Sequence, residues 1–461
     1  MRVLLISTYE LGHQPVHVAS PAAALRAAGH DVRCLDLSVQ PWDGDAVGWA
    51  GAVGLSVPMH TAMRLAVRAA EAIRRARPDV PICFYGLYAP VSRDLTLGRL
   101  ADRVIAGEYE PGLVAWAGGA AGPASLIDLG HGRARFQVPA RDLLPPLDRY
   151  ARLALGGEER LAAAVEATHG CRYTCRHCPV PTVYDGAFRV VGSEPVLADI
   201  AQLVEAGARH ITFADPDFLN GPAHSLRIVR AMHRRFGELT FDCTVKIEHI
   251  LRHAALWPEL AASGCLFVVT ALECVNDRIL ALLDKGHTAA DAARAVTVLR
   301  EHGIEPRPSL MPFVPWTTVE DVVDILDFVL AHDLIDNVDA VHYTIRLLLP
   351  PGSLLLDREA IAPHLGPYDA ERLSYRWSAA DPQADDLHER LTRIVTDSVE
   401  AGDPPGVTFP LVDAVVREAA GLPARAALAG SPEGRGRSRP RLTEPWFCCA
   451  EPTEGQFGLV C

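Results

Sequence analysis

The sequence predicts an α/β protein in which two parallel-sheet domains precede a helical extension and a cysteine-containing tail. Short apolar runs alternate with amphipathic helical segments up to about residue 355, a rhythm typical of parallel strands covered by helices. A proline- and arginine-bearing stretch, residues 132–155, interrupts that rhythm and is predicted to be a linker. The length of 461 residues also exceeds what one ordinary hydrophobic core needs.

The N-terminal part, residues 1–131, is predicted to form the first sheet. We expect strands at residues 3–7, 31–37, 52–57 and 81–85, with helices at residues 20–28 and 61–76. Ligands of such sheets bind beyond the carboxyl ends of the strands, so the loops at residues 9–15, 58–61 and 86–90 are candidates. No G-x-G-x-x-G follows the first strand, which argues against a dinucleotide site.

The central part, residues 156–355, repeats the strand–helix unit. We expect strands at residues 162–168, 210–214, 240–246, 266–272, 307–313 and 341–348, and helices at residues 195–206, 224–235, 254–262, 277–284, 289–302 and 318–332. Six such units predict a partial (β/α)6 TIM-type barrel whose chemistry lies at the carboxyl ends of its strands.

Three cysteines follow the first barrel strand with C-x3-C-x2-C spacing: Cys171, Cys175 and Cys178. Thiolates ligate iron–sulfur clusters, and a cubane held by three of them keeps one iron open for a small molecule. The alternative is a structural zinc site, which requires a fourth ligand such as His169 or His177.

This spacing, with the ring residue His177 before the last cysteine, resembles the signature of the radical S-adenosylmethionine (SAM) superfamily. The resemblance implies a [4Fe-4S] cluster whose open iron binds the amino and carboxylate groups of SAM. It further implies reductive cleavage of SAM with an electron from a flavodoxin- or ferredoxin-type donor.

The same resemblance implies SAM-binding positions. Asp215 or Asp217, after the second barrel strand, would accept a hydrogen bond from the SAM amino group; the alternative is a helix cap or a turn. Glu273, after the fourth strand, would hold the ribose. Arg307 and Arg346 are the candidates for the SAM carboxylate, and either could equally hold a substrate or a structural partner.

The first domain resembles the cobalamin-binding domain that precedes many radical SAM domains, through the segments at residues 53–58 and 84–86. The resemblance implies a Rossmann-like fold with cobalamin as a possible further cofactor. The chain has Tyr9-Glu10-Leu11-Gly12-His13 where that family has D-x-H-x-x-G. We therefore expect His13 and His17 to be loop residues rather than cobalt ligands.

Residues 356–429 are predicted to be a helical extension, with helices at 382–402 and 410–420, followed by a flexible tail at 430–461. The tail carries Cys448 and Cys449, and thiolates bind soft metals and thiophilic metalloids. Two alternative interpretations are that the two cysteines are an incidental surface thiol pair, or that they form a metal site together with Cys461. The run from Cys448 to Pro452 resembles the tail of the CUAEP/CCAEP-tail radical SAM proteins, some of which carry selenocysteine at the second position.

Composition narrows the functional classes. The net charge of −13 argues against a general nucleic-acid surface. Apolar residues make up 49%, and no apolar run reaches the roughly 18 residues of a membrane span. Eleven cysteines spread along the chain do not form a secreted disulfide framework, so we expect a reducing cytoplasm.

Together these features predict a radical SAM enzyme that forms a new bond on a small molecule. The main hypothesis is a thiophilic or metalloid substrate held by Cys448 and Cys449. The resemblance to radical SAM proteins with a cysteine pair in the tail implies transfer of the 3-amino-3-carboxypropyl group of SAM to arsenic as one candidate reaction. One alternative is a cobalamin-dependent radical SAM methyltransferase. The other is a non-catalytic zinc-binding scaffold.

Overall fold

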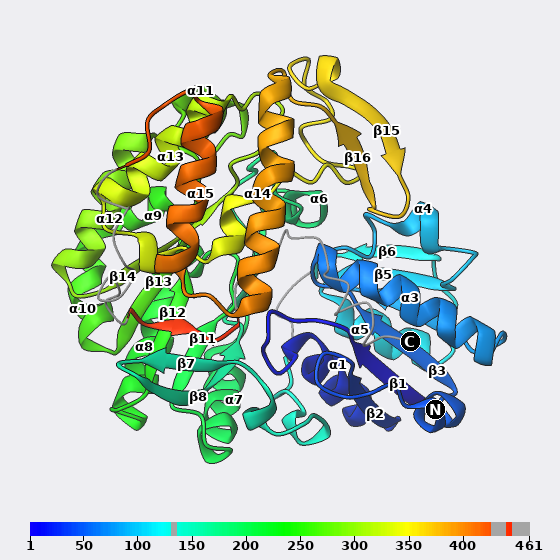
Figure 1. Cartoon of the computed structure of the whole chain (residues 1–461). Coiled ribbons are helices and arrows are strands. Elements are labelled where there is room, and N and C mark those ends of the chain that lie inside the picture. Colours follow the sequence, from blue (N-terminus) through cyan, green and yellow to red (C-terminus); the bar gives the residue numbers. More distant parts are fainter. Residues whose placement is uncertain (131–135, 426–438, 445–461) are drawn as a thin grey trace.

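The computed structural model describes residues 1–130, 136–425 and 439–444. Figure 1 shows an N-terminal α/β domain beside a larger curled sheet that is surrounded by helices. The predicted Rossmann-like domain, partial barrel and helical extension are all present, so the predicted fold class is confirmed.

The first domain is built on a parallel sheet with strand order β2-β1-β3-β4-β5-β6. Its strands are β1 (Arg2–Ser7), β2 (Asp31–Asp36), β3 (Ala52–Ser56), β4 (Ile82–Tyr85), β5 (Arg103–Gly107) and β6 (Ser125–Asp128). Its helices are α1 (Val16–Ala27), α2 (Gly44–Trp49), α3 (His60–Ala76), α4 (Arg93–Thr96) and α5 (Tyr109–Ala117). Strands β3 and β4 are buried along their whole length, as expected for strands covered on both faces.

The second sheet has the order β14-β13-β12-β11-β8-β7-β17. Its parallel strands are β8 (Glu158–Val165), β11 (His210–Phe213), β12 (Thr240–Thr244), β13 (Cys265–Glu273) and β14 (Glu305–Leu310). Two short strands, β7 (Arg152–Leu155) and β17 (Arg441–Leu442), extend the edge in antiparallel pairing. Strand β7 lies inside the stretch predicted to be a linker, together with the 3-10 turns η1 (Arg141–Leu143) and η2 (Leu147–Arg149).

Helices cover the outside of this curled sheet (Figure 1). They are α7 (Ser193–Glu205), α8 (Pro222–Arg235), α9 (Ile247–Arg252), α10 (Trp257–Ala262), α11 (Asp277–Leu282), α12 (Ala289–Glu301) and α13 (Val319–Ala331). Above β8 the chain forms a small antiparallel pair, β9 (Thr168–Gly170) and β10 (Phe188–Val190), with α6 (Val180–Tyr184) between them.

The predicted sixth barrel strand, residues 341–348, is wrong as a strand. The chain forms a 3-10 turn, η6 (Ala340–Tyr343), and then a single parallel bridge between Phe313 and Arg346. Two backbone hydrogen bonds make that bridge, from Phe313 N–H to the Ile345 carbonyl and from Leu347 N–H to the Phe313 carbonyl. The barrel is therefore open on this side, where the C-terminal extension packs.

The extension consists of a hairpin, β15 (Leu365–Asp369) and β16 (Ser374–Trp377), and two packed helices, α14 (Pro382–Ala401) and α15 (Pro405–Ala419). Helix α15 begins at Pro405 rather than at the predicted residue 410, because proline fits the first turn of a helix. Its internal Pro410 does not end it.

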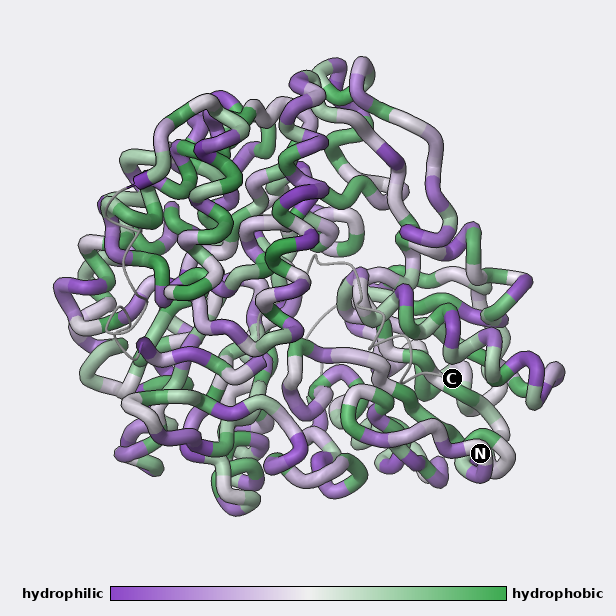
Figure 2. The backbone as a smooth tube through the Cα atoms, in the orientation of Figure 1, coloured by the Kyte–Doolittle hydropathy of each residue, from purple (hydrophilic) through white to green (hydrophobic). Residues whose placement is uncertain are grey.

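Hydrophobic stretches follow the strands and the helix sides that face them, and hydrophilic stretches lie toward the periphery (Figure 2). The largest core cluster fills the space between the second sheet and its helices, and includes the fully buried Trp257 and Phe241. Within the residues that the structure describes, no helix combines the length and apolar character needed to span a membrane.

Candidate functional site

The three cysteines of the C-x3-C-x2-C motif lie on one loop between β9 and α6, which we call the cluster loop (residues 171–178). The loop begins just beyond the carboxyl end of β8, the place where a parallel barrel carries its chemistry. Gly170 enters it with a φ of +75°, and a Cβ there would lie 2.6 Å from the Ala187 carbonyl oxygen. A glycine is therefore required directly before Cys171.

The thiols of the cluster loop are free, and they act on one another electrostatically. Burial raises the pKa of Cys171 to about 11, and the neighbouring Cys175 adds to this. Burial, and then Cys175, raise the pKa of Cys178 as well. Cationic iron would offset the cost of holding buried thiolates, so this soft donor set fits an iron–sulfur cluster.

His169 and His177, the alternative fourth zinc ligands, are engaged with carboxylates. His169 lies 3.1 Å from Glu108 and 3.4 Å from Glu166. His177 Nε2 lies 3.1 Å from Glu273 Oε1. In the described ranges, no three His, Cys, Asp or Glu side chains converge to hold one metal ion. A cubane spreads its cysteine ligands over separate irons and does not need such convergence.

One side of the cluster loop is held by Asn220, which closes the 3-10 turn η3 (Phe218–Asn220) after β11. The Arg172 N–H donates to Asn220 Oδ1 at 3.2 Å, and Cys171 Sγ lies 3.8 Å from the same oxygen. The Arg172 guanidinium also donates to the Asn220 carbonyl. The buried amide therefore fixes the backbone beside the first cysteine.

The middle of the cluster loop is held by Tyr173. Its hydroxyl lies 2.9 Å from His249 Nε2 and accepts a hydrogen bond from Arg252 at 3.1 Å. The ammonium of Lys246 lies 3.6 Å from the centre of the Tyr173 ring, a cation–π contact. Lys246 directly precedes α9, and His249 and Arg252 belong to that helix, so the segment after β12 supports the loop.

Glu273 lies at the carboxyl end of β13 with a φ of +65°. Its Oε1 accepts from Lys285 Nζ at 2.9 Å, and the same oxygen contacts His177. Burial alone would raise the pKa of Glu273, but the Lys285 ammonium and the His177 imidazole hold it well below the usual range. This glutamate is therefore an anion joined to the cluster loop.

Asp217 takes the capping role that the alternative named, and Asp215 is held by a different part of the chain. Asp215 is buried and accepts from the Ala167 N–H at 3.1 Å and the Thr168 hydroxyl at 2.5 Å. Asp217 caps η3 through the Leu219 N–H at 3.0 Å, and its other oxygen lies 2.8 Å from His249 Nδ1. Whether either also contacts SAM stays a prediction.

Arg307 and Arg346 each have a carboxylate partner within the chain. Arg307 lies 2.8 Å from Asp339. Arg346 lies 2.6 Å from Asp385 of α14, and its guanidinium stacks 3.6 Å from the ring centre of Trp377. The structure does not bring either arginine to the cluster loop through any contact among the described residues. Their pairing with the SAM carboxylate stays a prediction.

Sequence reasoning assigned no cluster- or SAM-binding role to Lys246 and Lys285, two buried lysines beside the cluster loop. Lys246 is 8% exposed and Lys285 is 3% exposed. A lysine so deeply buried is rare unless it is paired. The available signal was a lysine at the end of a barrel strand and another in the turn Asp284-Lys285-Gly286.

His13 and His17 lie in the loop after β1 and in the first turn of α1. His13 is buried, which lowers its pKa to about 4, and the charges acting on it come from Asp242, His210 and Arg141. His17 Nδ1 lies 2.8 Å from the Tyr109 hydroxyl and its Nε2 lies 3.5 Å from Glu166. Both imidazoles therefore lie at the joint, the region where the first domain contacts the second.

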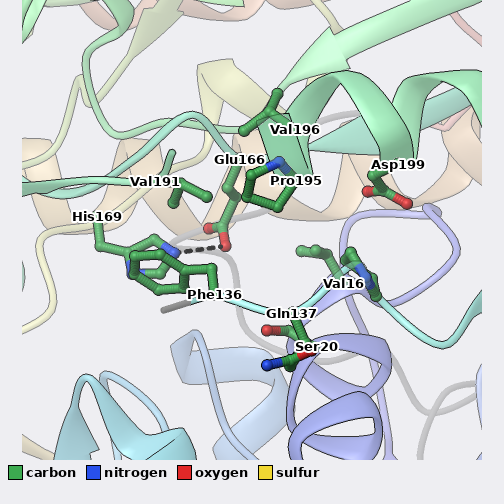
Figure 3. Close-up of a pocket in the computed structure, with 11 residues that line it drawn as sticks. Val16, Ser20, Phe136, Gln137, Glu166, His169, Val191, Pro195, Val196 and Asp199 are labelled. Atoms are coloured by element: carbon green, nitrogen blue, oxygen red, sulfur yellow. Dashed lines mark ion pairs between the residues drawn. The ribbon is translucent and has the colours of Figure 1, made fainter. Parts of the chain in front are cut away.

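A small cavity of about 30 Å³ lies in this joint, beside Glu166 and His169 (Figure 3). Val16 and Ser20 of α1 line one side, and Val196 and Asp199 of α7 line the other. Its volume is enough for a water molecule and too small for an organic ligand. A larger cavity of about 330 Å³ lies beside Arg176 and Trp316, and its volume is that of a small-molecule site.

The tail residues Cys448 and Cys449 lie outside the described residues. The last described residue before them, Glu444, accepts a hydrogen bond from the Tyr9 hydroxyl at 3.1 Å. Gly12 packs so closely that a Cβ there would lie 2.5 Å from Glu444 Cγ. Glu444 is thus docked on the loop that follows β1.

Two family models match the chain. Residues 165–329 match the radical SAM superfamily, and residues 2–117 match the B12 binding domain. The chain is 23% identical over 338 residues to the hopanoid C-3 methylase of Methylococcus capsulatus. The aligned region covers 66% of this chain and 62% of that protein's length. A shorter segment of 171 residues is 29% identical to the tRNA-2-methylthio-N(6)-dimethylallyladenosine synthase of Mannheimia succiniciproducens, covering 34% of this chain and 35% of that one.

Two solved structures share the fold over most of the chain. The cobalamin-dependent SAM radical enzyme OxsB with aqua-cobalamin bound has a TM-score of 0.68 at 14% identity, covering 90% of this chain and 73% of its own. The radical SAM methyltransferase TsrM from Kitasatospora setae, with cobalamin and a [4Fe-4S] cluster bound, has a TM-score of 0.65 at 17% identity, covering 91% and 99%.

The radical SAM match identifies the chain as an enzyme of the radical SAM type. The radical SAM domain implies a [4Fe-4S] cluster and SAM, and the B12-binding domain supports cobalamin as a further cofactor. The resemblance of the tail to the CUAEP/CCAEP group stays a prediction. The chain carries a radical SAM domain and, ahead of it, a B12-binding domain.

Proposed function

We propose that the chain is a cobalamin-dependent radical SAM methyltransferase that acts on a small molecule. One observation carries the proposal: the carboxyl end of β5, in the B12-binding domain, adjoins the cluster loop. Glu108, directly after β5, lies 3.1 Å from His169 and 3.3 Å from the Tyr184 hydroxyl. Parallel sheets bind ligands at this edge, so the cobalamin edge of one domain meets the cluster loop of the other.

The comparisons favour this alternative over the main sequence-based hypothesis. The hopanoid methylase and the methyltransferase TsrM both carry methyl transfer in their names. TsrM shares the fold over 91% of the present chain, and so on both sides of the domain joint. Because the chain covers only 62% of the methylase, the acceptor of that protein does not transfer to this one.

We assign Cys171, Cys175 and Cys178 as ligands of the [4Fe-4S] cluster. When bound, this cluster supplies the electron that breaks a carbon–sulfur bond of SAM, and cobalamin supplies a carrier for the methyl group. The chain's own contribution is to hold the loop rigid. Asn220 fixes its start, Tyr173 fixes its middle, and the Glu273–His177 contact fixes its end.

For SAM, we assign the ribose to Glu273, since its Oε2 is not used by Lys285 or His177. A carboxylate oxygen accepts readily from hydroxyl groups. We assign the SAM carboxylate to Lys246, whose only described carboxylate neighbour is Glu248 at 3.5 Å. Arg307 and Arg346 are weaker candidates because both are already paired.

The metalloid hypothesis is a second candidate, and the docked Glu444 favours it. Cys448 follows Glu444 by four residues, a reach of at most about 14 Å for an extended chain. Glu444 itself contacts the loop after β1, at the ligand-binding edge of the B12-binding domain. A vicinal thiol pair there could present a trivalent arsenic species.

The two candidates predict different fragments of SAM. The protein is prepared without oxygen, its cluster is reconstituted, and SAM and dithionite are added with or without hydroxocobalamin. Methyl transfer predicts S-adenosylhomocysteine that forms only in the presence of hydroxocobalamin. Transfer of the 3-amino-3-carboxypropyl group predicts methylthioadenosine that forms without it, and that result would overturn the methyltransferase proposal.

A further inference from the structure

Glu108 contacts both flanks of the cluster loop, through His169 before it and Tyr184 after it. The residue is 3% exposed and directly follows β5 of the B12-binding domain. Its Oε1 lies 3.1 Å from Nδ1 of His169, which stands two residues before Cys171. The same oxygen accepts from the hydroxyl of Tyr184, the last residue of α6, which leads away from Cys178. One carboxylate thus braces the loop at its entry and at its exit.

The backbone around Glu108 holds this carboxylate in place. Gly107 has a φ of +79°, and a Cβ there would lie 2.0 Å from the Asp128 carbonyl oxygen. The Glu108 N–H donates to that same carbonyl at 2.6 Å. The end of β5 is therefore locked to β6, and the Glu108 side chain has little freedom to follow a shift of the loop.

Apolar packing reinforces the brace. Ala106 of β5 packs with Val180, Val183 and Tyr184 of α6, and Cys171 and Cys178 pack against the same cluster. On the far side of the imidazole, His169 Nε2 lies 3.4 Å from Glu166, which continues from β8. The B12-binding domain and the barrel thus hold the loop between them.

We infer that Glu108 is a positioning residue that couples the cobalamin site to the cluster site. The inference rests on the proposed function, because it needs cobalamin at the carboxyl edge of the first sheet. A corrin bound at that edge would restrain the end of β5, and Glu108 would pass the constraint to His169 and Tyr184 on the two flanks of the cluster loop. Coupling of this kind is reciprocal, so the cluster must strengthen cobalamin binding by the same factor.

The test measures the dissociation constant of hydroxocobalamin by anaerobic absorption titration of the full chain. Each protein is titrated with its cluster reconstituted and again as the cluster-free C171A/C175A/C178A variant. For the native sequence, the cluster should tighten binding by at least about fivefold, the lower range of allosteric coupling. In Glu108→Gln and in Tyr184→Phe the ratio should fall toward one, while the cluster-free affinity stays unchanged.

Glu110→Gln is the matched control. Glu110 lies in the first turn of α5, two residues after Glu108, and accepts from Ser20 of its own domain at 2.8 Å, so the native ratio should persist. The EPR spectrum of the reduced cluster provides a second readout, and it should respond to hydroxocobalamin in the native and Glu110→Gln proteins only. An equal ratio in native and Glu108→Gln proteins overturns the inference alone. Failure of every variant to bind hydroxocobalamin overturns the inference and the proposed function together.

Discussion

The guanidinium of Arg141 lies 2.9 Å from the carboxylate of Asp199, and both side chains are buried. A second contact at 3.1 Å makes the pair bidentate. The remaining donors of Arg141 reach the Gln14 carbonyl, after β1, at 3.0 Å and the Ala164 carbonyl of β8 at 2.7 Å. One linker residue therefore joins the B12-binding domain, α7 and the strand that leads to the cluster loop.

We expect Asp199→Ala to destabilise the protein by about 3–5 kcal/mol, because it leaves a buried guanidinium without its carboxylate partner. The measurement is chemical denaturation of the cluster-free chain. Asp142→Ala is the control, since Asp142 pairs with Arg26 at 2.8 Å with both side chains well exposed. That exposed pair should contribute less than about 1 kcal/mol. Equal losses of stability in Asp199→Ala and Asp142→Ala would contradict the conclusion that the Arg141–Asp199 pair joins the domains.

Substitution of Lys285 by Met should weaken SAM binding. The change removes the ammonium 2.9 Å from Glu273 and leaves a buried carboxylate with the His177 imidazole, at 3.1 Å, as its remaining partner. The pKa of Glu273 should rise toward its usual range as a result. The measurement is SAM affinity of the reconstituted protein, which should fall at least about tenfold, a loss of about 1.4 kcal/mol. Lys285→Arg, which keeps the charge, should retain most of the affinity.

Asp215 should give the stability a measurable pH dependence. Burial raises its pKa to about 7, above its ordinary unfolded value. The folded protein then holds a proton that the unfolded chain releases, so stability should fall as the pH rises from about 4 to about 7. The Asp215 contribution is at most about 4 kcal/mol over that range. Asp215→Asn should flatten the profile, and an unchanged slope would assign it to other groups.

Replacement of any one of Cys171, Cys175 and Cys178 by Ala should prevent stable assembly of the cluster. Three protein thiolates hold a cubane with a single iron left open, and each variant supplies only two of them. Iron and sulfide content after anaerobic reconstitution is the measurement. Cys34→Ala, in β2 of the other domain, should retain the full content. Full iron in a Cys178→Ala protein would exclude the assigned ligand set.

Serine replacement of both Cys448 and Cys449 separates the two candidate functions. Under the methyltransferase proposal, S-adenosylhomocysteine should form at the native rate. Under the metalloid hypothesis, the native protein should bind arsenite stoichiometrically and the double variant should not, because hydroxyl groups lack the softness of thiolates. Arsenite binding that survives in the double variant would remove the tail from that hypothesis.

Much of the fold could be predicted because its central strands are short apolar runs buried on both faces. The strand at residues 52–57 and the capped helix at residues 318–332 are local patterns, and β3 and α13 match them. Strands β5 and β6 were not predicted. They are four or five residues long and begin with the polar residues Arg103 and Ser125, so no apolar run marks their start.

The site could be predicted only where its residues are close in sequence. The cysteine spacing is local, and the three residues do share one loop. The partners of Arg346 are not local: Asp385 and Trp377 come from the extension, and they occupy a guanidinium that the sequence left available for SAM. Glu108 and His169 are 61 residues apart, and no periodicity relates them.

The most direct test of the central claim is the metal content of the chain after anaerobic reconstitution with iron, sulfide and hydroxocobalamin. We predict about four irons and about one cobalt per chain. The C171A/C175A/C178A variant should lose the iron and keep the cobalt. A native protein that binds zinc in place of iron, or that takes up iron but no cobalt, would contradict the account.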